Sequence, residues 1–127
     1  MALSPDDHDL ARRLVEGAGS QAVRLRAARA DLKITHKQNS TDLVSAADLA
    51  AERHVVELLA RERPDDAILG EEGALRPGRS GRTWIIDPID GTYNFLRGSD
   101  RWCSAVALVD AGAPVLGAVA CPDRREV

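Results

Sequence analysis

The sequence has few aromatic residues and almost no lysine. Aromatic residues make up 3% of the 127 residues, and lysine occurs only at Lys33 and Lys37. Because 44% of the residues are hydrophobic, the core must consist mainly of Ala, Val, Leu and Ile, which is a globular composition. The 17 basic and 20 acidic residues give a net charge of −3 without a basic run, so we expect no nucleic-acid partner.

Long apolar stretches and cysteine clusters are also missing. No stretch approaches the roughly 18 apolar residues that a membrane-spanning helix needs, so we expect no membrane association. The first residues contain no basic patch followed by an apolar block, as a secretory signal would. Two cysteines, Cys103 and Cys121, cannot form a disulfide framework, and no Cys/His spacing suits zinc. We therefore predict a cytoplasmic protein.

The first half of the sequence predicts two helices. Ser4 is a typical N-cap before Pro5, and the apolar stripe that follows consists of Leu10, Leu14, Ala18, Ala22 and Leu25. Gly17 and Gly19 weaken this helix and indicate a close contact with another helix. A polar connector over residues 37–41 leads to a second helix that starts at Ser45, with Asp48 in its first turn, and ends before Pro64. Its predicted apolar face consists of Leu49, Val56, Leu59 and Ala60.

Short apolar runs after Pro64 predict strands. Residues 67–70 and 83–86 are candidates for buried strands, and the three glycines and one proline of residues 73–82 predict a loop between them. Residues 104–109 and 114–120 predict a hairpin. The expected fold class is α+β, with two helices packed on a mostly antiparallel sheet in one domain over residues 1–127.

Cys103 and Cys121 are expected to lie nearly opposite each other across that hairpin. We interpret them as a structural pair of small buried thiols. A redox pair is the alternative, but proximity alone does not lower the pKa of a thiol.

The segment from Asp87 to Thr92 carries the strongest chemical signal. Two carboxylates, Asp87 and Asp90, are separated by a proline that stiffens the turn, and they are expected just past the end of a strand. Gly91 permits a close backbone approach, and Thr92 opens a short helix whose free N–H groups favour an anion. Carboxylates beside an anion site are compatible when a hard divalent cation lies between them, which predicts Mg²⁺ and phosphate.

Further carboxylates occur at Asp48, Glu71 and Glu72. Several carboxylates that reach one point repel one another unless cations screen them. Glu71 and Asp87 must then meet at one sheet edge, although only about ten loop residues separate their strands and a parallel crossover usually needs a dozen or more. An EF-hand counted from Asp87 fails at its third, fifth and twelfth positions, and no P-loop motif occurs.

Three ordered blocks resemble the signature of the inositol monophosphatase family. The members of this family are Mg²⁺-dependent, lithium-sensitive sugar-phosphate phosphatases. The first block is residues 42–48, with Ser45 where the family usually has threonine. The second is Gly70-Glu71-Glu72, and the third runs from Trp84 to Phe95. The small-residue hairpin over residues 114–122 fits as well. The resemblance implies a layered αβαβα sugar-phosphatase fold, of which this chain corresponds to the N-terminal half, as if truncated at the C-terminal end.

Carried over residue by residue, the resemblance implies a set of roles. The metal ligands would be Glu71, Asp87, Asp90 and the backbone carbonyl of Ile89. The catalytic residues would be Glu71 and Thr92, which orient and activate the attacking water, and Asp48, which acts through a water or a weaker metal site. The substrate phosphate would be held by the backbone of Gly91 and Thr92, with Lys37 as a nearby basic residue.

The function implied is Mg²⁺-dependent hydrolysis of a small phosphorylated polyol or sugar, first of all inositol monophosphate, by a metal-activated water. Within the same fold the alternatives are 3′-phosphoadenosine phosphate, fructose bisphosphate and histidinol phosphate. A homodimer is expected for the full-length form. Because family members are about twice as long, an alternative from another class is a catalytically silent fragment that binds metal but does not turn over.

Overall fold

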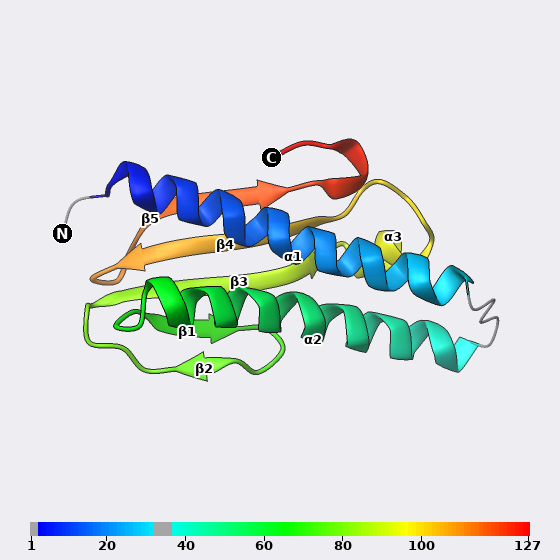
Figure 1. The fold of residues 1–127 in the computed structure, drawn as a ribbon, viewed down its shortest axis with the longest axis horizontal. Coiled ribbons are helices and arrows are strands. Elements are labelled where there is room, and N and C mark those ends of the chain that lie inside the picture. The colour runs from blue at the N-terminus through cyan, green and yellow to red at the C-terminus, as the bar shows by residue number, and fades with distance from the viewer. Residues whose placement is uncertain (1–2, 32–36) are drawn as a thin grey trace.

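The structure is a computed structural model that describes residues 3–31 and 37–127, with side chains described for residues 3–28 and 46–127. The chain folds into two long helices, α1 (Pro5–Asp31) and α2 (Lys37–Glu62), and a five-stranded sheet. Both helices lie side by side on the same face of the sheet (Figure 1). Within the described residues, neither helix has an apolar stretch of the length needed to cross a bilayer.

The sheet has the strand order β2-β1-β3-β4-β5. The strands are β1 (Ala67–Gly70), β2 (Leu75–Arg76), β3 (Arg82–Asp90), β4 (Cys103–Asp110) and β5 (Ala113–Ala120). Only the β1–β3 pair is parallel, and the other three pairs are antiparallel. The predicted α+β class with a mostly antiparallel sheet is therefore confirmed.

The short connection between β1 and β3 is explained by β2, a strand that the sequence did not predict. After β1 the chain turns back and pairs antiparallel with it, Ile68 opposite Arg76. This return brings the chain to the starting end of β1, from where it enters β3 in the same direction as β1. Ten or so residues are therefore enough, because no helix has to cross over the sheet.

Helix α1 begins as predicted. Ser4 accepts a hydrogen bond at its hydroxyl from the Asp7 N–H (3.3 Å), and Asp7 accepts one at its carboxylate from the Ser4 N–H (2.9 Å), which is a reciprocal cap. Its apolar stripe is in the core, where it packs against α2 and the sheet; the fully buried members of this cluster include Leu10, Leu14, Ala18, Val55, Leu59, Ile68, Trp84, Ile86 and Leu108. The close contacts predicted at the glycines are present, because a Cβ at Gly17 would overlap the His54 imidazole.

Helix α2 corrects two predictions. It begins at Lys37 and not at Ser45, so the expected polar connector over residues 37–41 is helical, and Asp48 lies in the fourth turn instead of the first. The connector contains neither glycine nor proline, so nothing in it interrupts a helix. The buried stripe is Ala47, Ala51, Val55 and Leu59, whereas Leu49 is 50% exposed.

Strand β3 is longer than predicted. It continues through Asp87 and Pro88 to Asp90, so the two carboxylates lie within its last residues and not beyond its end. The pairing with β4 shifts between Asp87, opposite Ala105, and Asp90, opposite Cys103. An irregularity of this kind accommodates a proline, which cannot donate to the ladder. The Ser104 hydroxyl fixes the segment by donating to the Pro88 carbonyl (2.6 Å).

The remaining elements agree with the sequence. The hairpin of β4 and β5 turns at Ala111 and Gly112, whose positive φ angles of 51° and 83° are those of a tight hairpin turn. The short helix α3 (Thr92–Leu96) starts at Thr92 as expected, and a single 3-10 turn, η1 (Pro122–Arg124), follows β5.

Candidate active site

The turn after β1 carries Glu71 and Glu72 and is held by a residue of α2. Glu52, which is buried, accepts hydrogen bonds from the backbone N–H groups of Glu72 (3.1 Å) and Ala74 (3.0 Å). Its carboxylate lies against Gly70 so closely that a Cβ at this glycine would overlap it. The Glu71 N–H donates to the Ile86 carbonyl on β3 (3.2 Å). Glu52 therefore positions this acidic turn against the neighbouring strand.

Asp48 on α2 is buried and faces this acidic turn. Burial, together with the negative charges of Glu72, Asp87 and Glu71, raises the pKa of the Asp48 carboxyl to about 7. Burial and a neighbouring carboxylate, Glu52, also raise the pKa of Glu72. Asp48, Glu71 and Asp87 were predicted to share one site, and the structure brings them within electrostatic reach of one another.

Asp87 on β3 is a further, partly buried acid of this group. Burial raises its pKa to about 6, helped by a hydrogen bond with the Glu71 carboxyl and by the charge of Asp90. Its Oδ1 atom is buried and has no hydrogen-bond partner. A buried carboxylate oxygen without a donor is costly, and a cation is one way to satisfy it.

The donor set fits a hard divalent cation. Carboxylates and a backbone carbonyl are the oxygen ligands that Mg²⁺ prefers, whereas zinc and the softer transition metals favour nitrogen and sulfur. In the part of the chain that the structure describes, no three acidic, histidine or cysteine side chains lie close enough together, as they stand, to hold a metal ion. The orphaned oxygen of Asp87 and the raised pKa values point to the place where such a shell would form.

Downstream of Asp87, the structure places the other predicted residues as follows. The Thr92 hydroxyl donates to the Ile89 carbonyl (3.4 Å), which is the carbonyl that the resemblance implies as a ligand. Gly91 precedes α3 with φ 90° and ψ 43°, a left-handed conformation that favours glycine. The side chain of Lys37 lies outside the described residues, so its role as a basic residue near the phosphate stays a prediction.

The glycine at position 91 has no room for a side chain. A Cβ there would lie 2.9 Å from the Arg101 carbonyl oxygen, in addition to the strain of a positive φ. We therefore expect Gly91→Ala to lower the free energy of unfolding by about 2 kcal/mol or more, measured in urea. Gly98→Ala is the matched control, because Gly98 also has a positive φ (77°) but open space around its Cβ. Equal losses for the two variants would contradict the crowded packing at Gly91.

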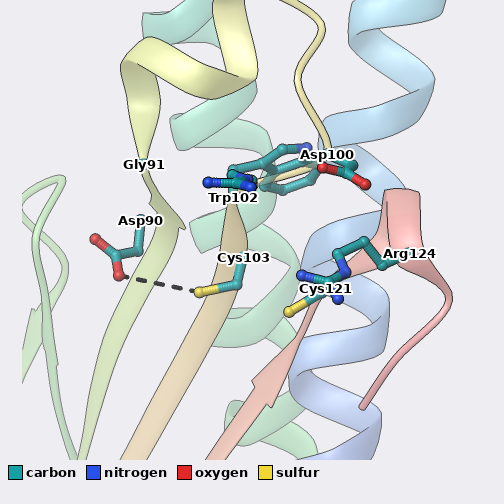
Figure 2. Close-up of a pocket in the computed structure, with 8 residues that line it drawn as sticks. Asp90, Gly91, Asp100, Trp102, Cys103, Cys121 and Arg124 are labelled. Carbon is teal, nitrogen blue, oxygen red and sulfur yellow. Dashed lines mark hydrogen bonds between the residues drawn. The ribbon is translucent and has the colours of Figure 1, made fainter.

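Asp90, the last residue of β3, is exposed. Its carboxylate lies at the rim of an open pocket of about 240 Å³, and its Oδ2 is 4.0 Å from the Cys103 Sγ (Figure 2). The pocket is also lined by Trp102, Cys121 and Arg124. Burial raises the pKa of the Cys103 thiol, and the charge of Asp90 adds to this. Asp90 therefore connects the acidic cluster to a cavity in which a ligand could lie.

The raised pKa values of Asp48 and Asp87 predict how pH affects stability without metal. A carboxyl with a raised pKa holds its proton more tightly in the folded chain than in the unfolded chain. The two protonated carboxyls therefore stabilise the fold at low pH. Their contribution to the free energy of unfolding is lost as the pH rises from about 4 towards 7. We expect a loss of roughly 2 kcal/mol in metal-free buffer, measured as the free energy of unfolding at pH 5 and pH 8.

Mg²⁺ should replace the lost protons. Saturating Mg²⁺ at pH 8 is expected to raise the Tm by several degrees, since 100-fold excess over the Kd adds about 2.7 kcal/mol, and it should raise the Tm much less at pH 5. An equal Tm increase at both pH values would contradict binding at the protonatable cluster.

Sequence reasoning missed Glu52. It was not singled out, because its partners are backbone N–H groups some twenty residues away. The available signal was its position one helical turn after Asp48, which places both acids on the same side of α2.

The protein is a helix-covered mixed sheet in which α2, the turn after β1 and the end of β3 contribute carboxylates to an acidic, oxygen-donor site. Residues 8–127 match the Inositol monophosphatase family, and the chain belongs to this family. It is 43% identical over 120 residues to a histidinol-phosphatase of Mycobacterium tuberculosis, covering 94% of this chain and 45% of that protein. It is 42% identical over 91 residues to the Nus factor SuhB of Xylella fastidiosa, covering 72% of this chain and 33% of that protein.

Solved structures agree with the fold. The inositol monophosphatase II of Staphylococcus aureus superimposes with a TM-score of 0.80 at 27% identity, covering 96% of this chain and 45% of that one. The predicted resemblance to the family is therefore confirmed. The chain spans less than half the length of the relatives it matches.

Proposed function

We propose that this chain carries the metal-binding half of a Mg²⁺-dependent phosphatase that hydrolyses a small phosphate monoester. The observation that carries the proposal is the convergence of Asp48, Glu71 and Asp87 from three elements, with an orphaned carboxylate oxygen on Asp87. Membership of the Inositol monophosphatase family and relatives named as phosphatases support the same reaction class.

The residues of this chain would have separate roles in binding metal, orienting water, moving a proton and binding phosphate. Glu71, Asp87, Asp90 and the Ile89 carbonyl would hold Mg²⁺, which when bound supplies positive charge to the phosphoryl oxygens and acidifies water. Glu71 and Thr92 would orient the attacking water, and a carboxylate of the cluster would accept its proton. Asp48, with a pKa near 7, would hold a proton in this exchange at neutral pH. The backbone N–H groups of Gly91 and Thr92 would bind the phosphate oxygens.

Two substrates have specific support. Inositol monophosphate is supported by the family and by the similarity to an inositol monophosphatase structure. Histidinol phosphate is the second candidate, because the relative with 43% identity over 94% of this chain is named a histidinol-phosphatase. 3′-Phosphoadenosine phosphate and fructose bisphosphate are weaker alternatives within the same fold. A cytoplasmic location, a homodimer of the full-length form and the absence of a nucleic-acid partner are further predictions.

The test is phosphate release from each of these four monoesters with and without Mg²⁺, paired with calorimetric titration of Mg²⁺ and Mn²⁺. Mg²⁺-dependent release by this chain supports the proposal directly. Metal binding without release would favour the alternative of a catalytically silent module. If the chain neither binds metal nor releases phosphate, both the proposal and its alternative are contradicted.

A further inference from the structure

Cys103 and Cys121 form a cross-strand pair at the end of the β4–β5 hairpin. Ser104 is opposite Ala120 in the ladder, so the next pair along the two strands is Cys103 with Cys121. Both thiols are free, both are partly exposed, and both line the pocket next to Asp90. Figure 2 shows Cys103 between Asp90 and Cys121, on neighbouring strands. The sequence predicted the pairing correctly but was wrong in expecting buried thiols.

The backbone hydrogen bonds define the type of this pair. The Cys121 N–H donates to the Glu126 carbonyl (2.7 Å), and the Cys121 carbonyl accepts from the Glu126 N–H (3.3 Å). Both backbone groups of Cys121 therefore point away from β4, and Cys103 and Cys121 are a non-hydrogen-bonded pair. In such pairs the Cα atoms are only about 4.5 Å apart and the side chains lie closest.

This spacing suits a disulfide. Two cysteines can be bridged without backbone movement when their Cα atoms are roughly 4.4–6.8 Å apart. The Cys103 Sγ is held only by its long contact with Asp90 Oδ2 (4.0 Å), so it is free to turn toward its neighbour. The open pocket gives a small oxidant access to both sulfur atoms.

We propose that Cys103 and Cys121 are an oxidation site that closes a reversible disulfide across β4 and β5 in the presence of a small disulfide such as oxidised glutathione. One cysteine, as thiolate, attacks a glutathione sulfur, forming a mixed disulfide and releasing one glutathione thiol. The second cysteine then attacks its neighbour's sulfur and releases the other glutathione thiol. Two thiols are oxidised, one glutathione disulfide is reduced, and the two protons end on the released thiols.

The experiment is mass spectrometry of the folded 127-residue chain after incubation with oxidised glutathione and acid quenching. Trypsin cleaves after Arg101 and Arg124, so both cysteines fall in one peptide, residues 102–124. The expected result is that this peptide loses two hydrogen atoms, keeps no glutathione and returns to its original mass with reductant. This readout does not depend on phosphatase activity, so its failure and the failure of the proposed function are distinguishable.

The matched variants are Cys103→Ser and Cys121→Ser. In each variant the remaining cysteine should retain one glutathione as a mixed disulfide, and no internal disulfide should form. The circular dichroism spectrum of each variant should be like that of the wild type. Three wild-type outcomes would overturn the proposal: two unmodified thiols, a glutathione retained on each cysteine, or two copies of the peptide joined between chains.

Discussion

Replacing Asp87 with asparagine is expected to lower Mg²⁺-dependent phosphate release by about 100-fold or more. The amide keeps the size of the side chain but removes the negative charge and one acceptor oxygen. Asp87 Oδ1 is buried and has no hydrogen-bond partner among the described residues, so it is available to a metal ion. Losing a preorganised electrostatic contact to the reacting group costs roughly 10²–10³ in rate.

Asp65→Asn is the control for this variant. Asp65 carries the same side chain just before β1, but it is exposed and lies outside the acidic cluster. Its activity should equal that of the wild type. If Asp87→Asn kept more than a tenth of the wild-type rate at saturating Mg²⁺, Asp87 would not be a metal ligand.

Asp7→Ala is expected to lower the free energy of unfolding by about 3–5 kcal/mol, a large part of the stability of a small domain. Asp7 is buried and accepts two hydrogen bonds from the Arg82 guanidinium, each of 3.0 Å, and Arg63 approaches its Oδ1 at 3.3 Å. Alanine would leave the buried Arg82 charge without its main partner. The pair joins the first turn of α1 to the start of β3, so it fixes the helix on the sheet.

Urea unfolding measures this loss, with Asp9→Ala as the control. Asp9 is exposed and pairs with Arg13 one turn away on the same helix (3.0 Å), a contact worth less than about 1 kcal/mol. Hydrogen bonding to Arg82 holds the pKa of Asp7 well below its usual range. Its contribution is therefore present above about pH 4 and is lost as the pH falls. Equal losses for the two variants would show that the buried pair is not important for stability.

The sequence predicted α1 and the β4–β5 hairpin well, because each depends on local signals. Ser4 and Pro5 define the helix start, and Ala111-Gly112 fits a tight turn with positive φ angles. The start of α2 was predicted wrongly because a polar stretch without glycine or proline is compatible with both a loop and a helix. The end of β3 was predicted wrongly because a proline is unfavourable inside a strand, although the irregular pairing there accommodates Pro88.

The candidate site was predicted only in part. The motif around Asp87 and Gly91 was visible from spacing, but its neighbours are set by the tertiary fold. Asp48 reaches the site from the fourth turn of a helix whose start was predicted wrongly, and Glu52 acts through backbone groups of a distant turn. Strand β2, only two residues long, explains how Glu71 and Asp87 meet, and a strand that short has no pattern of its own.

The most direct test of the metal site is calorimetric titration of Mg²⁺ into the reduced chain at pH 8, above the raised pKa values of Asp48 and Asp87. We expect saturable binding by the wild type and at least a tenfold higher Kd for Asp87→Asn, whereas Asp65→Asn binds like the wild type. Absence of saturable binding by the folded wild-type chain, or identical binding by Asp87→Asn, would contradict it.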